Sequence, residues 1–520
     1  MESKKIVKVA DKDIDLSVID FRKKKDISQA ILRFMDAAST STARATAYNT
    51  KEEQNLAQKS IHESVFKIDR GLYGALLLLD GNTDHTKTMG VEKLLSDRTA
   101  FDKSSLEPTI ERNILVYLLS HVPVQRMMKM YLNMKKERIN NSRSKKIMLY
   151  SILGSNSIEY WSVKYKRKIR NILEHTWGKK LSSIIASILS KEKSKWNAKE
   201  ETIIVQNVLK YVGNNDTKNV YECISFVFGN EKDLNLSVLK SYSESKTDIT
   251  KGSKLPAEVL EGIRSTYHKK IKPEKILEIC KDTFTDKERM QVQKRAEKAK
   301  VDIKFDPTKQ ELIELYIYSY ANGMNKELKE AIAKKASNIA SDLPVSYEKI
   351  CIVLDASGSS YGSDTQKLRP LASSLAMRDV FCALSKECII KTVGGKIKND
   401  LLYPEGNTDI ATPLLECIKE NPQAIYIITD GYENSPAGRT NELVAALKKI
   451  GIEIPVYQIS PVMSADAGGV KKLSEFIPVL PVSNPKAIGM GMFKAQLEAD
   501  TEQGVLSLFT MTLSKLSKNV

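Results

Sequence analysis

The chain has 520 residues, of which 42% are hydrophobic, and a formal net charge of +17. A chain of this length can bury two or more full cores, and its composition is that of a globular protein. The basic N-terminus leads into no apolar run and no other stretch reaches membrane-spanning length, so we expect a cytoplasmic protein that does not enter a membrane.

The six cysteines do not suggest a disulfide framework or a zinc site. They show no Cys-x-x-Cys pair and no dense spacing, and Cys351 lies inside an apolar run. We therefore expect reduced thiols, most of them in the core.

The excess positive charge is confined to the first two thirds of the chain. Residues 346–520 contain 18 Lys and Arg against 19 Asp and Glu, whereas residues 1–345 contain 63 against 45. The net charges are therefore −1 and +18. This asymmetry indicates a polyanion-binding region joined to a nearly neutral domain. The alternative is a helical surface that is rich in lysine and merely solvated.

Taken in order, the chain begins with a polar, basic arm over residues 1–50, which includes a loop of small residues at 39–46. Apolar residues at helical spacing then continue to about residue 343, without a strand signal. We predict helices over residues 72–79, 110–119, 124–134, 147–153, 181–189, 203–212, 257–266, 273–280, 287–299, 310–320 and 326–341. The polar residues 241–254 are expected to form a long surface loop or an excursion between helices. Ordinary helices with short links predict stacked helical pairs in a degenerate HEAT-like array over residues 51–344.

One helical segment, residues 164–180, interleaves basic and aromatic side chains. Basic groups neutralise phosphates and aromatic faces stack on unpaired bases, so the segment is a candidate RNA-binding site. The alternative is a solvated basic helix whose aromatic side chains face inward. The candidate residues are Lys164, Tyr165, Lys166, Arg167, Lys168, Arg170 and His175.

After residue 344, strand and helix patterns alternate, which predicts a doubly wound α/β domain over residues 345–503. We expect strands at 349–354, 387–393, 424–428, 454–459 and 477–482, with helices at 368–384, 409–420, 441–450, 469–476 and 485–499. The apolar tail, residues 504–520, is expected to dock back on the helical region.

Polar side chains follow two of these strands at the point where each ends. Asp355, Ser357 and Ser359 follow the first strand and Asp430 follows a later one, while Thr408 opens a helix between them. Carboxyl ends of parallel strands meet at one edge of the sheet, where open α/β sheets bind their ligands. Carboxylate and hydroxyl oxygens suit Mg²⁺, or alternatively Mn²⁺.

A catalytic interpretation of this edge is less well supported than a binding one. There is no Gly-x-Ser-x-Gly elbow, no histidine lies beyond His268, and no second carboxylate adjoins Asp355 for a phosphatase. Asp355 and Ser357 would otherwise serve only as a turn and a helix cap. We therefore predict binding, in which a metal held largely by neutral hydroxyls recruits a carboxylate or phosphate from a partner.

Asp-x-Ser-x-Ser at 355–359, Gly-x-Thr-Asp-Ile at 406–410 and Thr-Asp-Gly at 429–431 resemble the metal-ion-dependent adhesion site of von Willebrand factor A domains. The resemblance implies that Ser357 and Ser359 bind the metal directly, and that Asp355, Thr408 and Asp430 complete its inner and outer coordination. The family often has Gly where Asn407 stands.

A basic helical region followed by such a domain resembles the Ro autoantigen family, whose N-terminal region is the TROVE module. Lys164, Tyr165, Lys166, Arg170 and His175 look like an RNA-contacting stretch of that family. The resemblance implies a ring of HEAT-like repeats, binding of small noncoding Y-type RNA and of single-stranded 3′ ends of misfolded RNA, and cooperation with an exoribonuclease in RNA quality control.

Two functions from different classes remain open at this point. The first is a non-enzymatic Ro-like RNA-binding protein. The second is a helical scaffold with an A domain that acts as a protein-interaction adaptor without RNA, in which a partner supplies Asp or Glu to the metal. An adaptor for a chelatase or ATPase is a third, and the ATPase would be another chain because no Walker motif is present.

Overall fold

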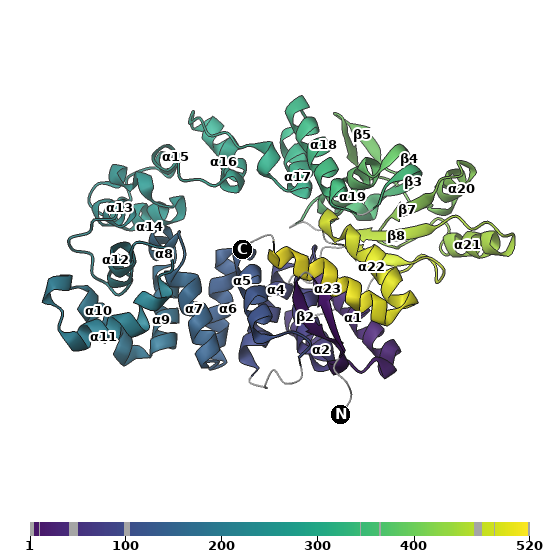
Figure 1. Ribbon diagram of the computed structural model, residues 1–520. Helices are drawn as coiled ribbons and strands as arrows, with labels where there is room; N and C mark the ends of the chain where they lie inside the picture. The colour runs from purple at the N-terminus through teal and green to yellow at the C-terminus, as the bar shows by residue number, and fades with distance from the viewer. Residues whose placement is uncertain are drawn as a thin grey trace. The chain divides into compact units, whose positions relative to one another are not determined.

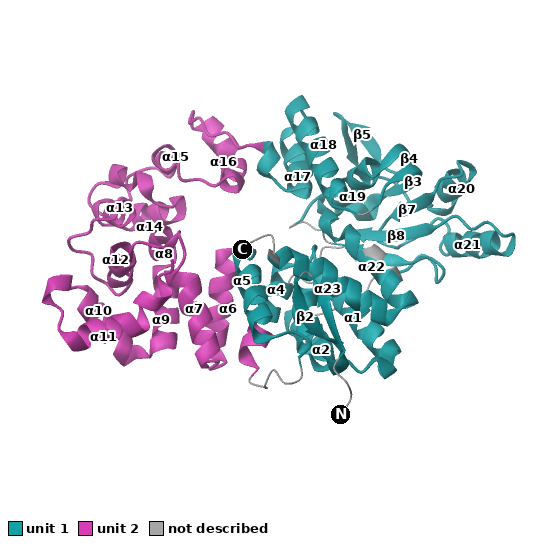
Figure 2. Ribbon diagram, in the orientation of Figure 1, with its two compact units in different colours: residues 1–91, 99–122, 307–520 teal, residues 92–98, 123–306 magenta. Residues whose placement is uncertain are grey.

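The computed structural model describes residues 5–9, 11–40, 50–97, 104–343, 345–362, 366–461, 471–482 and 484–517. The first two thirds of the chain are mostly helical, and a five-stranded parallel sheet follows near the C-terminal end (Figure 1). At this level the expected combination of an α-helical part and an α/β part is confirmed. The chain divides into two compact units (Figure 2): the first unit, residues 1–91, 99–122 and 307–520, and the second unit, residues 92–98 and 123–306.

The second unit consists of helices joined by short turns. They are α6 Val124–Lys136, α7 Ser142–Leu153, α8 Ile158–Lys164, α9 Lys166–Trp177, α10 Lys179–Leu189, α11 Ala198–Asn207, α12 Thr217–Val227, α13 Ser237–Glu244, α14 Ala257–Tyr267, α15 Glu274–Ile279 and α16 Asp286–Lys298. Helix α9 contacts α6, α7 and α10, and α8 contacts α12, α13 and α14. Of the two expectations for residues 241–254, the surface loop is wrong: α13 continues to Glu244 and a 3-10 helix spans Ile249–Lys254. Buried Leu239 and Ile249 hold these two elements against the core.

The first unit contains helices from both ends of the chain. They are α1 Lys24–Thr40, α2 Lys51–Ile68, α3 Arg70–Leu77, α5 Pro108–Ser120, α17 Leu312–Asn322, α18 Lys326–Ser341, α22 Ile488–Ala499 and α23 Thr501–Ser517, while α4 Asp84–Ser96 crosses the unit boundary. Residues expected to form an arm instead include the hairpin β1 Ile6–Val9 and β2 Lys12–Asp15, and α1, whose Ile27, Ile31 and Phe34 are buried at helical spacing. Residues 41–46 of the predicted loop lie outside the described residues.

The sheet lies in the first unit and has the strand order β4-β3-β7-β8-β9, with every neighbouring pair parallel. Its strands are β3 Tyr347–Ala356, β4 Ser385–Gly394, β7 Ala424–Ile428, β8 Val456–Pro461 and β9 Val479–Val482. A small antiparallel pair, β5 Lys396–Lys398 and β6 Leu401–Tyr403, follows β4. Strand β3 lies between β4 and β7 and is buried from Ile350 onward, as its unbroken apolar run predicts.

Helices cover both faces of this sheet. On one face, α20 Ala411–Lys419 and α21 Arg439–Lys449 bury Leu414 and Val444 against Val353 of β3. On the other face, α19 Arg369–Ala383 stacks Phe381 on Tyr426 of β7, with ring centroids 4.0 Å apart.

Two details of the α/β part differ from the sequence expectations. No helix forms over 471–476, the described part of the helix predicted at 469–476, because the Leu473 amide donates to Gln458 Oε1 at 2.9 Å. Cys382 and Cys388 form a disulfide, so the expectation of reduced thiols is wrong for these two, while the other four cysteines are free and buried. The turn from α19 into β4 brings the two sulfur atoms together.

The C-terminal helix α23 lies against α1, α3 and α5 of the same unit. Lys515 secures it by donating to the Leu78 carbonyl at 2.9 Å and pairing with Asp80 at 2.7 Å. Among the described residues, no helix combines the length and the apolar character needed to cross a membrane.

A buried histidine in the first unit makes its stability depend on pH. His62 lies 2.7 Å from the Tyr73 hydroxyl, and burial, reinforced by electrostatic repulsion from His85, lowers the pKa of His62 to about 3. The unfolded chain therefore binds a proton that the folded chain excludes, and stability falls as pH drops from about 6.5 toward 3. Between pH 6.5 and 5 we expect a loss of about 2 kcal/mol. Urea unfolding at both pH values checks this, and His62→Gln should remove most of the difference; the same loss in both proteins would contradict it.

Candidate functional site

Three loops meet at the carboxyl edge of the sheet and form the candidate metal site, which comprises Asp355, Ser357, Ser359, Thr408 and Asp430. Strands β3 and β7 are parallel neighbours with Leu354 opposite Ile428, so the loops that follow them start side by side. The Gly358 amide donates to the Gly406 carbonyl at 3.1 Å. The Thr408 amide donates to Asn434 Oδ1 at 2.9 Å, which ties the loop that precedes α20 to the loop that follows β7.

Within this site, the carboxylate of Asp355 is held from two sides. Asp355 is 2% exposed, and its oxygens accept from the Ser357 amide at 2.9 Å and from the Thr429 hydroxyl at 2.7 Å. The hydroxyl oxygens of Ser357 and Ser359 lie 3.3 Å apart. The structure therefore brings together the parts of the motif that the sequence analysis singled out.

The charges at this edge favour a cation. Burial raises the pKa of Asp355, and the negative charge of Asp430 raises it further, while the hydrogen bonds from Ser357 and Thr429 act in the opposite direction. A divalent ion would neutralise this buried charge. Among the described residues, no group of three or more His, Cys, Asp or Glu side chains is placed to hold a metal. The candidate metal site has only two such side chains, Asp355 and Asp430, and its other oxygen donors are hydroxyls. These hard oxygen donors fit Mg²⁺ or Mn²⁺.

Sequence reasoning missed three residues that shape the site. The Thr429 hydroxyl donates to the Asp355 carboxylate, and the Asn434 side-chain oxygen accepts from the Thr408 amide. Gly394, at the end of β4, has φ of 62°, and a Cβ there would lie 2.3 Å from the Glu405 carbonyl oxygen. Only glycine allows β4 to end this close to the backbone of Glu405, in the loop that precedes α20. The position of Thr429 next to Asp430 at a strand end was a usable signal.

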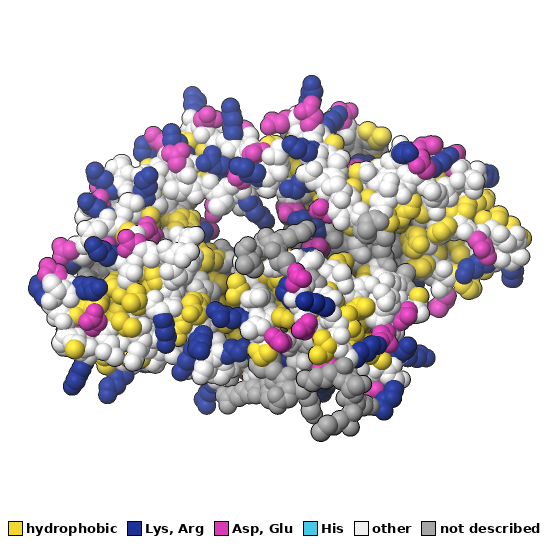
Figure 3. All heavy atoms as spheres, in the orientation of Figure 1, with side chains coloured by type: hydrophobic (Ala, Val, Ile, Leu, Met, Phe, Trp, Pro, Cys, Tyr) yellow, Lys and Arg dark blue, Asp and Glu magenta, His cyan; other side chains and the backbone are white. Residues whose placement is uncertain are grey.

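The second candidate site is the basic pocket, a hollow of about 390 Å³ in the second unit at the start of α9. Its lining residues are Leu132, Val163, Lys164, Tyr165, Lys166, Arg167, Lys168 and Asn171. Four of these lining residues are basic: Lys164, Lys166, Arg167 and Lys168. On the face of this unit that Figure 3 shows, Lys and Arg side chains are spread out with Asp and Glu among them.

The lysines of the basic pocket differ in what they contact. Lys164 lies 3.5 Å from Glu288 and 3.7 Å from Glu258, and Lys166 lies 2.8 Å from Glu231. Burial alone would lower the pKa of Lys164. The negative groups of Tyr160, Glu258 and Glu288 outweigh this effect, so the pKa of Lys164 is raised. These two lysines are thus partly committed to carboxylates of their own unit.

Arg167 and Lys168 form no ion pair with any residue that the structure describes. Lys168 Nζ lies 5.4 Å from the ring centroid of half-buried Tyr165. They are therefore the cations of the pocket best able to accept a phosphate.

The two remaining predicted RNA contacts, Arg170 and His175, do not line the pocket. Arg170 pairs with Glu174 at 3.0 Å. His175 donates from Nε2 to the Ile139 carbonyl at 2.9 Å, and burial, together with the charges of Lys135 and Lys145, lowers its pKa. A neutral, occupied imidazole is poorly suited to bind phosphate.

Comparison with known proteins found no protein-family model and no curated protein that matches this chain. The function is therefore inferred from the two sites themselves.

Proposed function

We propose that this protein is a cytoplasmic, non-enzymatic RNA-binding protein of the Ro type, with a HEAT-like helical part and a von Willebrand factor A-like domain. It would bind small noncoding, Y-type RNA and the single-stranded 3′ ends of misfolded RNA, and act in RNA stability or quality control. The observation that carries the proposal is the basic pocket, in which Arg167 and Lys168 stand beside Tyr165 without a carboxylate partner among the described residues.

Charge and shape support this proposal in different ways. The +18 of residues 1–345 provides the sequence-independent attraction to phosphates, which governs most of the affinity for nucleic acid. The pocket adds a place where a phosphate meets two cations while a neighbouring base stacks on Tyr165. RNA is favoured over duplex DNA because an aromatic face is useful only to an unpaired base.

The candidate metal site would give the protein a second, separate binding function. A Mg²⁺ or Mn²⁺ ion held by the hydroxyls of Ser357, Ser359 and Thr408 keeps a strong affinity for an added oxygen ligand. A partner protein, such as an exoribonuclease, would supply that ligand as Asp or Glu. Asp355 and Asp430 would offset the charge of the ion.

The second candidate function is a protein-interaction adaptor without RNA. It is favoured by the assembly of the metal site within the first unit alone, since a partner could bind there whatever the helical surface does. In that case the basic pocket would be a solvated surface.

Binding of a labelled RNA stem-loop with a single-stranded 3′ tail separates the two functions. Fluorescence anisotropy of the purified protein should show binding at ~0.1 M salt that weakens steeply as salt rises. Duplex DNA of equal length serves as the control and should bind more weakly, and EDTA should leave RNA binding unchanged because the metal does not contact the RNA. Failure to bind the RNA at this salt concentration would contradict the proposal and leave the adaptor function.

A further inference from the structure

Two of the six cysteines differ from the rest in exposure and position. Cys223, Cys280, Cys351 and Cys417 are free and buried. Cys382 and Cys388 are both partly exposed and are joined to each other, with Cα atoms 5.2 Å apart. That separation lies within the range of natural disulfides, so the backbone at this turn is compatible with the bond.

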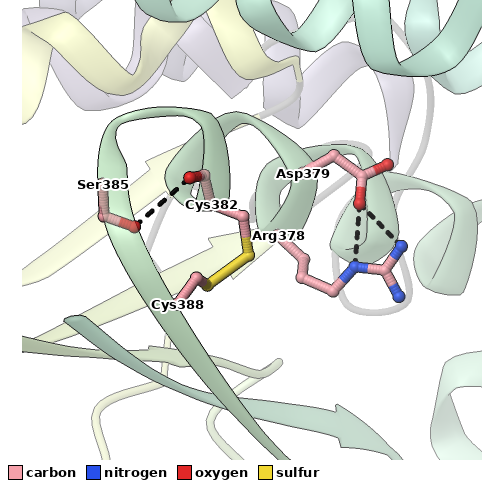
Figure 4. Close-up of a disulfide and its surroundings, with 5 residues drawn as sticks. All are labelled: Arg378, Asp379, Cys382, Ser385 and Cys388. Atoms are coloured by element: carbon pink, nitrogen blue, oxygen red, sulfur yellow. Dashed lines mark hydrogen bonds and ion pairs between the residues drawn. A yellow bond between two sulfur atoms is a disulfide. The ribbon is translucent and has the colours of Figure 1, made fainter. Parts of the chain in front are cut away.

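The pair joins a helix to the edge of the sheet. Cys382 lies in the last turn of α19 and Cys388 in β4, and Ser385, the first residue of β4, donates to the Cys382 carbonyl at 3.2 Å (Figure 4). Strand β4 is one of the two edge strands of the described sheet, with β3 as its neighbour. The disulfide therefore fastens the exposed end of β4 to the helix that covers one face of the sheet.

We propose that Cys382 and Cys388 form a reversible thiol–disulfide site whose reaction partner is a small-molecule disulfide of the glutathione type. The sulfur atoms are close enough to bond without movement of the backbone, and both are within reach of a small molecule, whereas the other four thiols are enclosed. This inference concerns a site outside the basic pocket and the candidate metal site, and it stands whether or not the protein binds RNA.

The reaction takes place in two exchange steps. The Cys388 thiolate attacks one sulfur of oxidised glutathione, which forms a mixed disulfide and releases one glutathione thiolate that takes up a proton. The Cys382 thiol then loses its proton and attacks the Cys388 sulfur, which releases the second glutathione. The two protein thiols are oxidised to one disulfide and the glutathione disulfide is reduced to two thiols, so electrons and protons balance.

The order of attack follows from the elements that carry the two sulfur atoms. Cys382 lies at the C-terminal end of α19, where the helix dipole disfavours a negative charge. Cys388 lies outside the helix, and Lys386 projects from the same side of β4 two residues earlier. Lys386 pairs with Glu348 at 2.7 Å, so its effect is partial, and the helix end supplies the main difference. Cys388 is therefore the attacking sulfur and Cys382 the resolving one.

Intact-mass measurements on the full-length protein test the proposal. The protein is reduced, freed of reductant, incubated with defined ratios of reduced to oxidised glutathione, and alkylated without denaturation. Wild type should lose two alkylation sites together as the ratio falls and gain no stable glutathionyl group. Cys382→Ser should accumulate one glutathionyl group at Cys388, whereas Cys388→Ser should accumulate several-fold less. Cys223→Ser is the matched control and should behave as wild type.

Thermal unfolding provides a second readout that does not depend on trapping an intermediate. Oxidised wild type should melt a few degrees above reduced wild type, because the bond restricts the unfolded chain. Cys382→Ser should show no such difference. The proposal is overturned if wild type accumulates glutathionyl groups on both cysteines instead of closing the disulfide. It is equally overturned if both thiols stay alkylatable in oxidised glutathione, or if Cys388→Ser traps the adduct as well as Cys382→Ser.

Discussion

Replacing Arg167 and Lys168 together by glutamate should weaken binding of the stem-loop RNA about a hundredfold at ~0.1 M salt. Both side chains line the basic pocket, and neither pairs with a carboxylate among the described residues, so both charges are available to phosphate. The change removes two counterion-releasing contacts and adds two repulsive charges. The slope of log affinity against log salt concentration should therefore decrease in magnitude by about two. Anisotropy titrations at several salt concentrations measure both quantities.

The matched control makes the same change in charge outside the pocket. Lys179 and Lys180 are exposed at the start of α10, and neither lines the hollow. Their replacement by glutamate should weaken RNA binding only several-fold, because it makes the overall electrostatic potential of the protein less positive. Equal losses in the two double variants would show that the RNA senses net charge and not the pocket. Wild-type affinity in the Arg167→Glu, Lys168→Glu protein would remove the pocket from the RNA site.

Lys164 and Arg170, which the sequence alone favours as RNA contacts, are less informative choices for mutation. Lys164 is bound to Glu258 and Glu288, so its removal leaves those carboxylates without their shared cation and alters the surface in more than one way. Arg170 lies outside the pocket and pairs with Glu174 one turn along α9. An affinity change in either variant would mix RNA contact with local rearrangement.

The parts of the fold that follow from local patterns were predictable. The helix predicted at 326–341 is α18, which has the same bounds, and the strand predicted at 349–354 lies inside β3. The convergence of the loops that carry the candidate metal site was predictable as well, because parallel strands end at a common edge. The hairpin β1–β2 was missed because strands of four residues give weak signals in a basic segment. The helix α1 was missed although Ile27, Ile31 and Phe34 recur at helical spacing, which was a usable signal.

The parts that depend on distant partners could not be predicted. Lys166 follows Tyr165 in a run of basic residues, but its carboxylate partner Glu231 lies 65 positions away. Nothing in the local sequence says that this lysine is paired, whereas Arg167 next to it has no ion-pair partner in the described part of the chain. The Cys382–Cys388 bond is a shorter-range case, because the two residues are only six positions apart, but it depends on the sharp turn from α19 into β4.

Asp355→Asn should abolish the response of the protein to divalent cations. At a Mg²⁺ concentration about 100 times the dissociation constant, wild type gains about 2.7 kcal/mol of stability by mass action, which raises its melting temperature by several degrees. The variant lacks the buried charge that balances the ion, although Asn retains an oxygen to accept from Thr429. Melting temperatures in a Mg²⁺ titration, and calorimetric titration with Mg²⁺ and Mn²⁺, measure the effect.

The behaviour in chelator distinguishes loss of a ligand from loss of the fold. Burial and the charge of Asp430 raise the pKa of Asp355, so without metal its carboxylate is an unfavourable charge that the neutral amide removes. In EDTA the amide removes this charge, but its nitrogen faces the Ser357 amide, which then lacks its acceptor, so the two effects oppose each other. The variant should therefore melt close to the wild-type temperature in EDTA, and Mg²⁺ should stabilise wild type alone. Asp409→Asn is the control: Asp409 accepts from the Thr412 amide at 3.2 Å and from the Thr412 hydroxyl at 2.7 Å, and asparagine keeps one of these acceptors. This change should therefore alter the melting temperature little, with or without Mg²⁺, and leave the response to Mg²⁺ intact. A variant at Asp355 that still responds to Mg²⁺, or a wild type that never does, would exclude metal binding at this edge.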